Sequence, residues 1–518
     1  MELTASKKFM FAWSSIGAVA LSIVALLPWR FQVNDDVIMM WLVSGAYTGT
    51  PEPYAVFIHP VLSWVFSKLY IGFPLFPWYE SVWFLGIYFS FILLLRGLLA
   101  TQLSQMVKSL MAFFLLLVSL HLTIFLQFTL VAGFLTFSAL VFLMENRPVF
   151  TKIVAFVLLT LGIMIRWESA VLIVLGYFFF IFFSQKLTWS PRFLRKFGIV
   201  SLLFILIIGS KFIYEENSPY ADFLRFNRLR ASVIDHPVFY QEVVEKKIPE
   251  DSELFFFSRW YFEDSGVSEA DLREKKIDLD AGFWSMDYTL DAFERLWGFQ
   301  RFEVFKSFLI FGILVFFFFA ARKSSSLVLF FGAWMLFFLT FNHFYLIQGR
   351  VIFLFFLCLI FPFFKAQDIY LDKRVIIGLV ISFSLTFGFH FLNFWKEAKG
   401  RDIMDNEFLT LKNKLNPSTP MVIEGYYEHN WKFKFSALNP VPFIATGWIS
   451  RSVFQKKALE RMNLSSLADI QEYALITPTT NTEIVFPDYM NHAFGDFVQT
   501  DSIRSANFIL LLFQKKDS

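Results

Sequence analysis

Residues 9–36 read FMFAWSSIGAVALSIVALLPWRFQVNDD, an apolar run that ends near an acidic pair. The run from Phe9 to Trp29 is about 20 residues long, which is enough to cross the hydrocarbon core of a bilayer. Lys7 and Lys8 precede it, and apolar residues continue beyond the small residues at 18–20, so we predict an uncleaved signal anchor. The polar sequence that follows it opens the first loop.

The composition of the whole chain places it among membrane proteins. Of 518 residues, 56% are hydrophobic, 20% aromatic and only 17% charged, which does not fit an ordinary soluble domain. The net charge of +3, without a basic stripe interleaved with aromatic residues, argues against a nucleic-acid partner. The single cysteine, Cys358, lies in an apolar run and excludes an intrachain disulfide.

Ten further spans are predicted, which makes about eleven. They lie near residues 79–99, 107–124, 126–144, 151–165, 168–184, 197–214, 304–321, 325–341, 350–366 and 374–394. With the N terminus in the cytoplasm, the inner ends carry Lys7, Lys8, Arg96, Lys108, Arg147, Lys152, Lys186, Arg192, Arg195, Lys196, Arg322, Lys323, Lys365, Lys373 and Arg374, against Glu2, Glu145, Asp368 and Asp372. This asymmetry follows the positive-inside rule and predicts a multi-pass protein of the inner or plasma membrane.

The same orientation sends three polar segments to the outer side: 30–78, 215–303 and 396–518. The first is expected to hold two surface helices, 35–47 and 56–72, because His59, Pro60 and Lys68 suit an interfacial helix better than a span. The last has helical patterns at 402–415 and 452–462 and strand patterns at 421–424, 473–477, 483–486 and 508–513. We therefore predict an all-α polytopic membrane domain, 1–395, and a small extracytoplasmic α/β domain, 396–518.

The tripeptide Asn34-Asp35-Asp36 admits two interpretations. Asn34 would cap a helix, with Asp35 and Asp36 in its first turn near the positive end of the helix dipole. Alternatively, the pair is functional, because acidic side chains near hydrocarbon are costly unless they are solvated or paired.

This organisation resembles the GT-C superfamily, polytopic glycosyltransferases that take sugar from a polyprenyl-phosphate carrier on the non-cytoplasmic side. Those enzymes are similar in having one span, an outer loop of surface helices that opens with an acidic pair, further spans, and often an outer C-terminal domain. Asn34-Asp35-Asp36 falls where the acidic motif of the family falls. The resemblance covers the membrane region, whereas the motif itself is only two residues.

The resemblance implies that one carboxylate is the general base that takes the acceptor proton, for which we choose Asp36. Asp35 would then orient the acceptor, or the two would help to hold a divalent cation such as Mg²⁺ or Mn²⁺.

Arginines at the outer ends of spans are candidate phosphate ligands, because a guanidinium binds phosphate through two parallel hydrogen bonds. Arg166 has Glu168 beside it, so a structural ion pair at a hairpin tip is the alternative. Arg350 opens a span after a glycine-containing loop, and its alternative role is an anchor in the headgroup region.

The loop 215–303 holds a polar cluster of Arg225, Asn227, Arg228, Arg230, Asp235 and His236, followed by the aromatic stretch 255–260. From it we select Arg225, Arg228 and His236 as ligands of the carrier phosphate in a lid, with a plain solvated surface as the alternative. Glu168, His59 and His343 complete the candidate substrate-binding residues. Structural hydrogen bonding is the simpler interpretation of both histidines, since neither has a neighbouring ligand at metal-binding spacing.

The predicted function is transfer of a sugar from a polyprenyl-phosphate donor to a glycan, lipid or protein acceptor on the outer face. The alternatives are a transporter or flippase of a lipid-linked saccharide and a polysaccharide polymerase or ligase. No P-loop, HExxH, GxSxG or strand-linked GxGxxG is present, so nucleotide-dependent chemistry in the cytoplasm is not supported.

Overall fold

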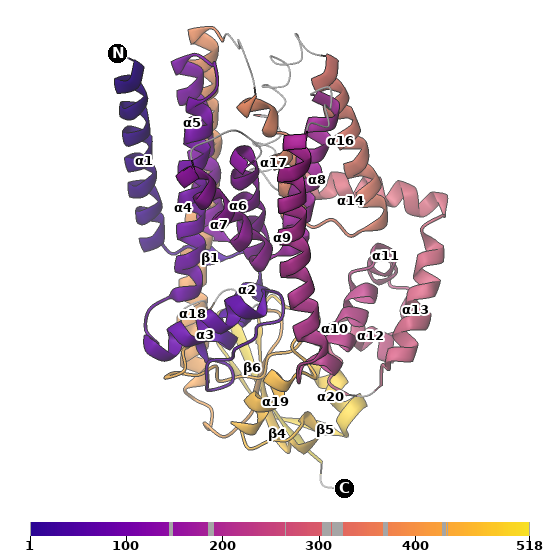
Figure 1. The fold of residues 1–518 in the computed structure, drawn as a ribbon. Helices are drawn as coiled ribbons and strands as arrows, with labels where there is room; N and C mark the ends of the chain where they lie inside the picture. The colour runs from indigo at the N-terminus through magenta and orange to yellow at the C-terminus, as the bar shows by residue number, and fades with distance from the viewer. Residues whose placement is uncertain are drawn as a thin grey trace.

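The computed structural model describes residues 2–143, 149–184, 191–264, 266–302, 312, 325–365, 371–426, 431 and 434–516. Long helices form a bundle, and the helices of the two long loops and the tail lie mainly toward the end opposite the N terminus (Figure 1). The bundle helices are α1 (Glu2–Leu26), α4 (Trp78–Leu99), α5 (Gln105–Ile124), α6 (Phe128–Leu143), α7 (Val149–Ile165), α8 (Trp167–Ser184), α9 (Pro191–Glu216), α16 (Ser325–Phe344), α17 (Gly349–Cys358) and α18 (Lys373–Lys412). They correspond to ten of the predicted spans. The other, 304–321, lies outside the described residues except for Gly312.

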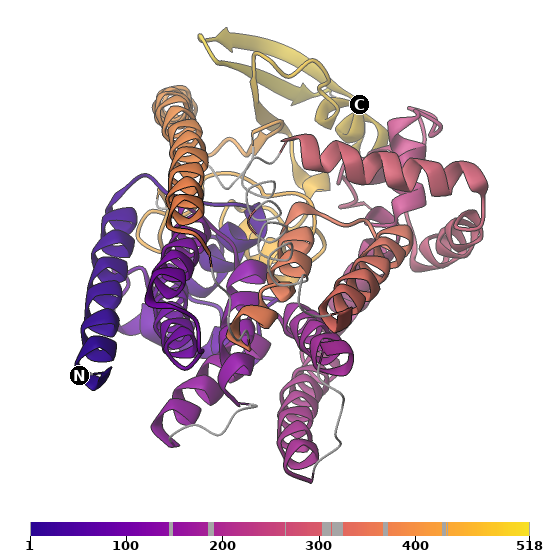
Figure 2. The ribbon, with the colours of Figure 1, turned by 90° about the horizontal axis from the view of Figure 1, so that it is seen from above.

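Within the described residues, α1, α4, α5, α9, α16 and α18 are long and apolar enough to cross a membrane. Four shorter apolar helices, α6, α7, α8 and α17, accompany them. Residues 128–142 of α6 are all buried, so this helix runs through the interior of the bundle. Seen from above, α1 lies at one edge of the bundle (Figure 2). The chain is thus a multi-pass membrane protein with a mostly helical fold, and the number of spans stays a prediction.

The first loop contains two helices, as predicted. They are α2 (Asn34–Ser44) and α3 (Pro60–Gly72), and α3 begins at 60 rather than 56 because Pro60 holds the preceding residue extended. A short parallel pair of strands, β1 (Arg30–Phe31) and β2 (Phe125–Leu126), ties the start of this loop to the junction of α5 and α6. The pairing sets the first turn of α2 beside the first turn of α6.

The second long loop forms five helices: α10 (Ala221–Ile234), α11 (Pro237–Val244), α12 (Glu253–Ser258), α13 (Glu269–Gly282) and α14 (Met286–Phe302). Apolar side chains of α10 to α13 and of the segments between them form a separate small core that includes Phe226, Phe257 and Phe262. The loop is therefore a folded unit at the side of the bundle.

The predicted boundary at 396 is not a break in secondary structure. Helix α18 runs without interruption for 40 residues, joining the predicted span 374–394 to the predicted helix 402–415. Gly400 is the only residue of low helix propensity near the boundary, and one glycine costs only about 1 kcal/mol relative to alanine. Arg30 and Arg401 fasten this helix to the first loop, through Glu397 at 2.6 Å and the Pro28 carbonyl at 2.6 Å respectively.

The tail domain has a four-stranded sheet in the order β3-β4-β6-β5. Its elements are β3 (Met421–Ile423), α19 (Val453–Glu460), β4 (Glu472–Pro478), α20 (Phe486–Phe494), β5 (Phe497–Arg504) and β6 (Phe508–Lys515). The pair β3–β4 is parallel and the others are antiparallel.

One predicted strand of the tail, 483–486, is wrong. The backbone N–H groups of Val485 and Phe486 donate to the Glu424 carboxylate, and Pro487 lies in the first turn of α20. These donors are therefore not available to a sheet. The strand β5 was not predicted, because its sequence is mostly polar and nearly all of it is exposed at the edge of the sheet.

Candidate functional site

The first turn of α2 sends its two carboxylates to different environments. Asp36 is fully buried, where its Oδ1 accepts from the Tyr79 hydroxyl at 2.9 Å and from the Phe128 N–H at 3.2 Å. Burial raises the pKa of Asp36 well above its ordinary value, and the hydrogen bonds from Tyr79 and Phe128 and the charge of Arg350 oppose this rise only in part. The N-cap residue of α2 is Val33, so Asn34 is not the helix cap that the sequence suggested. Asp36 instead connects α2 to α4 and α6.

Asp35, in contrast, remains partly exposed and faces an arginine. Its Oδ2 lies 3.6 Å from Nη1 of Arg350, and the side chains are 19% and 24% exposed respectively. This distance exceeds that of a hydrogen bond, so the two groups attract each other without a close bidentate contact. The structure therefore places a carboxylate and a guanidinium side by side, both within reach of solvent.

A second arginine comes from α10. Arg230 is 3% exposed, and its Nε and Nη2 donate to Asn227 Oδ1 at 3.0 and 2.8 Å. Its guanidinium lies 4.8 Å from the ring centre of Trp260. Desolvation lowers its pKa to about 10, so the side chain stays charged at neutral pH. Its Nη1 is buried and has no hydrogen-bond partner among the described residues, which leaves one charged donor for a ligand or water.

Asp235 follows α10 and connects these groups electrostatically. Its side chain is exposed, yet desolvation by surrounding protein raises its pKa. Arg230, Arg350 and Arg166 oppose this rise, and Asp35 adds to it. We call Asp35, Arg166, Arg230, Asp235 and Arg350 the charged cluster.

The predicted ion pair at the hairpin between α7 and α8 is present. Arg166 Nε lies 3.1 Å from Glu168 Oε2, and both side chains are partly exposed. The Arg166 guanidinium also lies 5.6 Å from the ring centre of Phe57 and 5.5 Å from that of Phe128. Phe128 therefore faces Arg166 with its ring and binds Asp36 through its backbone N–H.

Sequence reasoning missed the residue that fixes Phe57. The Lys211 ammonium of α9 donates to the carbonyls of Val56 and Phe57 at 3.1 and 3.0 Å, and lies 3.5 Å from Glu215. Val56 has φ of +62°, which is strained for a β-branched residue. Lys211 thus holds a strained turn that carries an aromatic ring against Arg166. The signal available in the sequence was a lysine inside the predicted span 197–214, one helical turn before Glu215.

Two glutamines beside the acidic pair also have unused polar atoms. Gln32 N–H donates to the Leu126 carbonyl at 2.9 Å, extending the register of β1 and β2 toward Gln127. Both amide atoms of Gln127 and Oε1 of Gln32 are buried without a partner in the described part of the chain. Such groups are rare in folded proteins and are frequent where a water or ligand binds.

Three residues predicted from loop 215–303 lie on other surfaces. Arg225 pairs with exposed Asp222 at 3.2 Å, and Arg228 with Glu215 at 2.9 Å. Arg230 lies about 160° around α10 from Arg228, on the opposite face. His236 caps α11 through the Val238 N–H at 3.2 Å, and its Nε2 lies 3.3 Å from Asp280.

The other two histidines predicted as site residues, His59 and His343, are hydrogen-bonded to the backbone. Nδ1 of His59 accepts from the Val61 N–H at 3.2 Å, and its Nε2 lies 3.1 Å from the Ile207 carbonyl, so the neutral ring protonated at Nε2 satisfies both contacts. Nε2 of His343 lies 3.0 Å from the Phe283 carbonyl. Both arrangements match the structural interpretation of these histidines.

The acidic pair does not fit a metal site that uses both carboxylates. Asp36 already accepts hydrogen bonds from Tyr79 and Phe128, and Asp35 faces Arg350. Among the described residues, no three His, Cys, Asp or Glu side chains gather in a metal-ligating group.

No protein-family model and no curated protein sequence matches the chain. Among solved structures, the crystal structure of ArnT from Cupriavidus metallidurans in the apo state is similar, with 12% identity over 98% of each chain and a TM-score of 0.43. The structure of the same protein bound to undecaprenyl phosphate gives 11% identity over 97% of each chain and a TM-score of 0.40. The function of the present chain is therefore inferred from its own side chains.

Proposed function

We propose that this chain is a membrane glycosyltransferase that moves a sugar from a polyprenyl-phosphate donor to an acceptor hydroxyl on the outer face. The observation that carries the proposal is the charged cluster, where partly exposed Asp35 lies 3.6 Å from Arg350 and interacts electrostatically with buried Arg230. A base next to several cations is what transfer of a glycosyl group from a phosphate requires.

The chemistry can be written with these groups. The acceptor oxygen forms a bond to the anomeric carbon while the bond from that carbon to the phosphate oxygen breaks. The electron pair leaves with the phosphate, and the acceptor proton passes to the Asp35 carboxylate. Arg350 and Arg230 stabilise the negative charge on the departing phosphate.

This proposal reverses the roles chosen from sequence for the two aspartates. Asp36 was the expected base, but its burial and its bonds to Tyr79 and Phe128 keep it from contact with an acceptor. Asp35 is the member of the pair that an acceptor can reach. In this proposal Asp36 positions α2, and through it Asp35.

The experiment that tests the function supplies purified protein in liposomes with polyprenyl-phosphate monosaccharides labelled in the sugar. Transfer predicts release of unlabelled polyprenyl phosphate together with a labelled acceptor. Intact labelled donor that only changes leaflet would instead identify a flippase. The placement of the cluster at helix ends favours transfer, because transport sites are expected near the membrane midplane at broken helices.

Metal dependence gives a further prediction. Since the two carboxylates of α2 are engaged with protein donors and Arg350, we expect EDTA to change turnover by less than about twofold, unlike a site built on carboxylate–metal bonds. The measurement is initial rate with EDTA and with Mg²⁺ or Mn²⁺ restored. Loss of activity that either ion rescues would contradict the proposed arrangement.

The topology is part of the proposal, with 30–78, 215–303 and 396–518 outside. In a Cys358→Ala background, a Gln499→Cys variant in exposed strand β5 should react with an impermeant maleimide on intact cells. The matched Lys8→Cys variant near the N terminus should react only after lysis. The reverse pattern would place the site in the cytoplasm and overturn an outer-face mechanism.

A further inference from the structure

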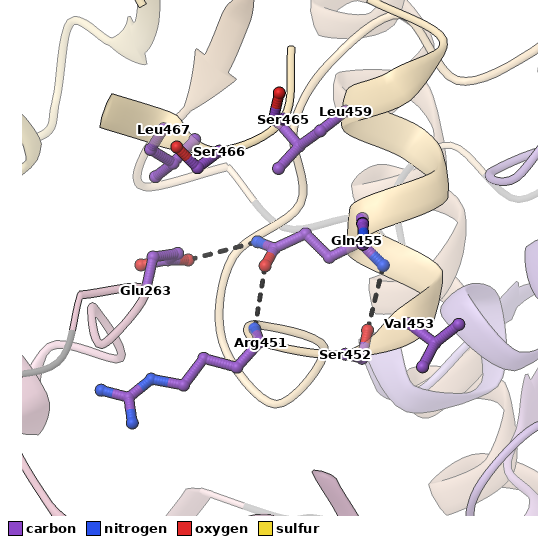
Figure 3. Close-up of a pocket in the computed structure, with 10 residues that line it drawn as sticks. Glu263, Arg451, Ser452, Val453, Gln455, Leu459, Ser465, Ser466 and Leu467 are labelled. Atoms are coloured by element: carbon purple, nitrogen blue, oxygen red, sulfur yellow. Dashed lines mark hydrogen bonds between the residues drawn. The ribbon is translucent and has the colours of Figure 1, made fainter. Parts of the chain in front are cut away.

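A cavity of about 260 Å³ lies between the second long loop and the tail domain. Figure 3 shows Glu263 of the loop on one side, Gln455 of α19 in the middle, and Ser465, Ser466 and Leu467 across from it. None of these residues belongs to the charged cluster, so the cavity is a separate feature.

The floor of the cavity is a carboxylate with polar neighbours. Glu263 Oε1 accepts from the Ser450 hydroxyl at 2.5 Å. It also lies 3.5 Å from Gln455 Nε2, the contact drawn in Figure 3. Arg451, which pairs with Asp264 at 4.0 Å, interacts with Glu263 only electrostatically, and Glu263 forms no ion pair among the described residues. Burial raises the pKa of this carboxyl. A poorly hydrated carboxylate without a direct ion pair is costly to keep, and such groups are enriched in binding sites.

The walls of the cavity are fixed without a ligand. Arg451, with φ of +62°, donates through Nε to the Phe262 carbonyl at 2.5 Å, and its guanidinium lies 4.3 Å from the ring centre of Phe226. Gln455 Oε1 accepts from the Arg451 N–H at 2.9 Å, and Gln455 Nε2 donates to the Ala445 carbonyl at 3.2 Å. Arg451 thus joins the tail to the loop rather than neutralising Glu263.

The lining suits a small neutral molecule rich in hydroxyl groups. Carboxylate oxygens accept hydroxyl protons, and the Ser465 and Ser466 hydroxyls can donate or accept. Leu459 and Leu467 offer apolar surface for the C–H faces of a ring. Arg451 and Lys456 also line the cavity, so its charged side chains are of both signs, which favours a neutral ligand over an anion. A single carboxylate is too few ligands for a divalent cation.

Both walls continue into residues next to the charged cluster. Glu263 lies three residues after Trp260, whose ring covers Arg230, and such a segment reaches at most about 10 Å. Ser450 lies two residues after Trp448, whose ring centre is 4.8 Å from that of Phe57. A molecule held in the cavity is therefore near the part of the charged cluster that contains Arg230 and near Phe57, which faces Arg166.

We propose that this cavity is a saccharide subsite that holds a sugar unit of the acceptor while another part of the acceptor reaches Asp35. The inference rests on the proposed glycosyl transfer and specifies the acceptor as a saccharide.

The test measures binding without turnover, on the full chain in lipid nanodiscs. Saturation-transfer NMR is recorded with methyl glycosides of neutral hexoses and of N-acetylhexosamines. We expect binding to wild type, and at least about tenfold weaker binding to Glu263→Gln, which loses a charged acceptor, and to Val453→Phe, which fills the cavity. Glu460→Gln, on the same helix α19 but outside the cavity, should bind as wild type does.

The outcomes separate this inference from the proposed function. Binding that persists in both Glu263→Gln and Val453→Phe, or its absence in wild type, overturns the subsite even if Asp35→Asn abolishes transfer. Conversely, the expected binding pattern in a protein that transfers no sugar from any lipid-linked donor would leave a saccharide site and refute the transferase.

Discussion

Replacing Asp35 with asparagine is expected to lower turnover by about 100-fold or more while the protein stays folded and inserted. The amide cannot accept the acceptor proton, but it is nearly isosteric and keeps an oxygen toward Arg350. Because Asp35 is partly exposed and its contact with Arg350 is 3.6 Å long, little stability depends on its charge. The measurement is turnover at saturating donor, together with thermal unfolding of the purified variant.

The Asp36→Asn variant should lose more stability and less turnover than the Asp35→Asn variant. Tyr79 and Phe128 can still donate to the asparagine oxygen, but the amide nitrogen replaces Oδ2, which accepts from the Phe128 N–H at 3.2 Å. Two donors then face each other in a buried site, at a cost of about 1–3 kcal/mol. We expect a lower unfolding temperature and a smaller loss of turnover than in Asp35→Asn. Asp222→Asn, at a carboxylate that is 94% exposed, is the control for charge alone. If Asp36→Asn abolished turnover in a fully stable protein and Asp35→Asn did not, the roles chosen from sequence would be restored.

The acidic pair shows what the sequence could and could not predict. Its position after the first span was visible from composition and charge. Which carboxylate faces the site depends on Tyr79 and Phe128, which are 43 and 92 residues away from Asp36. Adjacent residues of a helix point about 100° apart, so a choice between them needs the packing of α2 against α4 and α6. Arg350 was predicted as a site residue, and it does lie beside Asp35.

The loop 215–303 illustrates the same limit. Its polar residues were recognised as a group, but the face of α10 that turns inward was not. Arg230 is buried against Trp260, whereas Arg225 is more than half exposed. The buried aromatic contact, and not the density of charge, distinguishes these two arginines.

Helical architecture was more predictable than the tail, because apolar runs of span length are strong signals in the sequence. The fold of the tail was harder to predict for two reasons. The Glu424 side chain binds a backbone N–H group that a strand would need, and one edge strand, β5, is mostly polar.

Arg350→Lys is expected to weaken the apparent affinity for donor by about 10- to 100-fold. Lysine keeps the positive charge but loses the planar fork, and a charge-assisted hydrogen bond contributes about 1.5–3 kcal/mol. The measurement is KM for the lipid-linked sugar, with binding of free polyprenyl phosphate as a second readout. Arg225→Lys is the matched control, since Arg225 pairs only with Asp222 among the described acidic groups. An unchanged KM in Arg350→Lys would make Arg350 an anchor in the headgroup region.

Combining this change with Asp35→Asn separates two explanations of the Arg350 effect. If Arg350 binds the donor phosphate while Asp35 acts on the acceptor, the two losses should multiply in the double variant, because independent sites have additive free energies. If Arg350 acts only by holding Asp35 in place, Arg350→Lys should have no further effect once the carboxylate is gone. The contact of 3.6 Å is too long to hold Asp35 rigidly, so we expect the losses to multiply and the donor KM to rise by the same factor in both backgrounds.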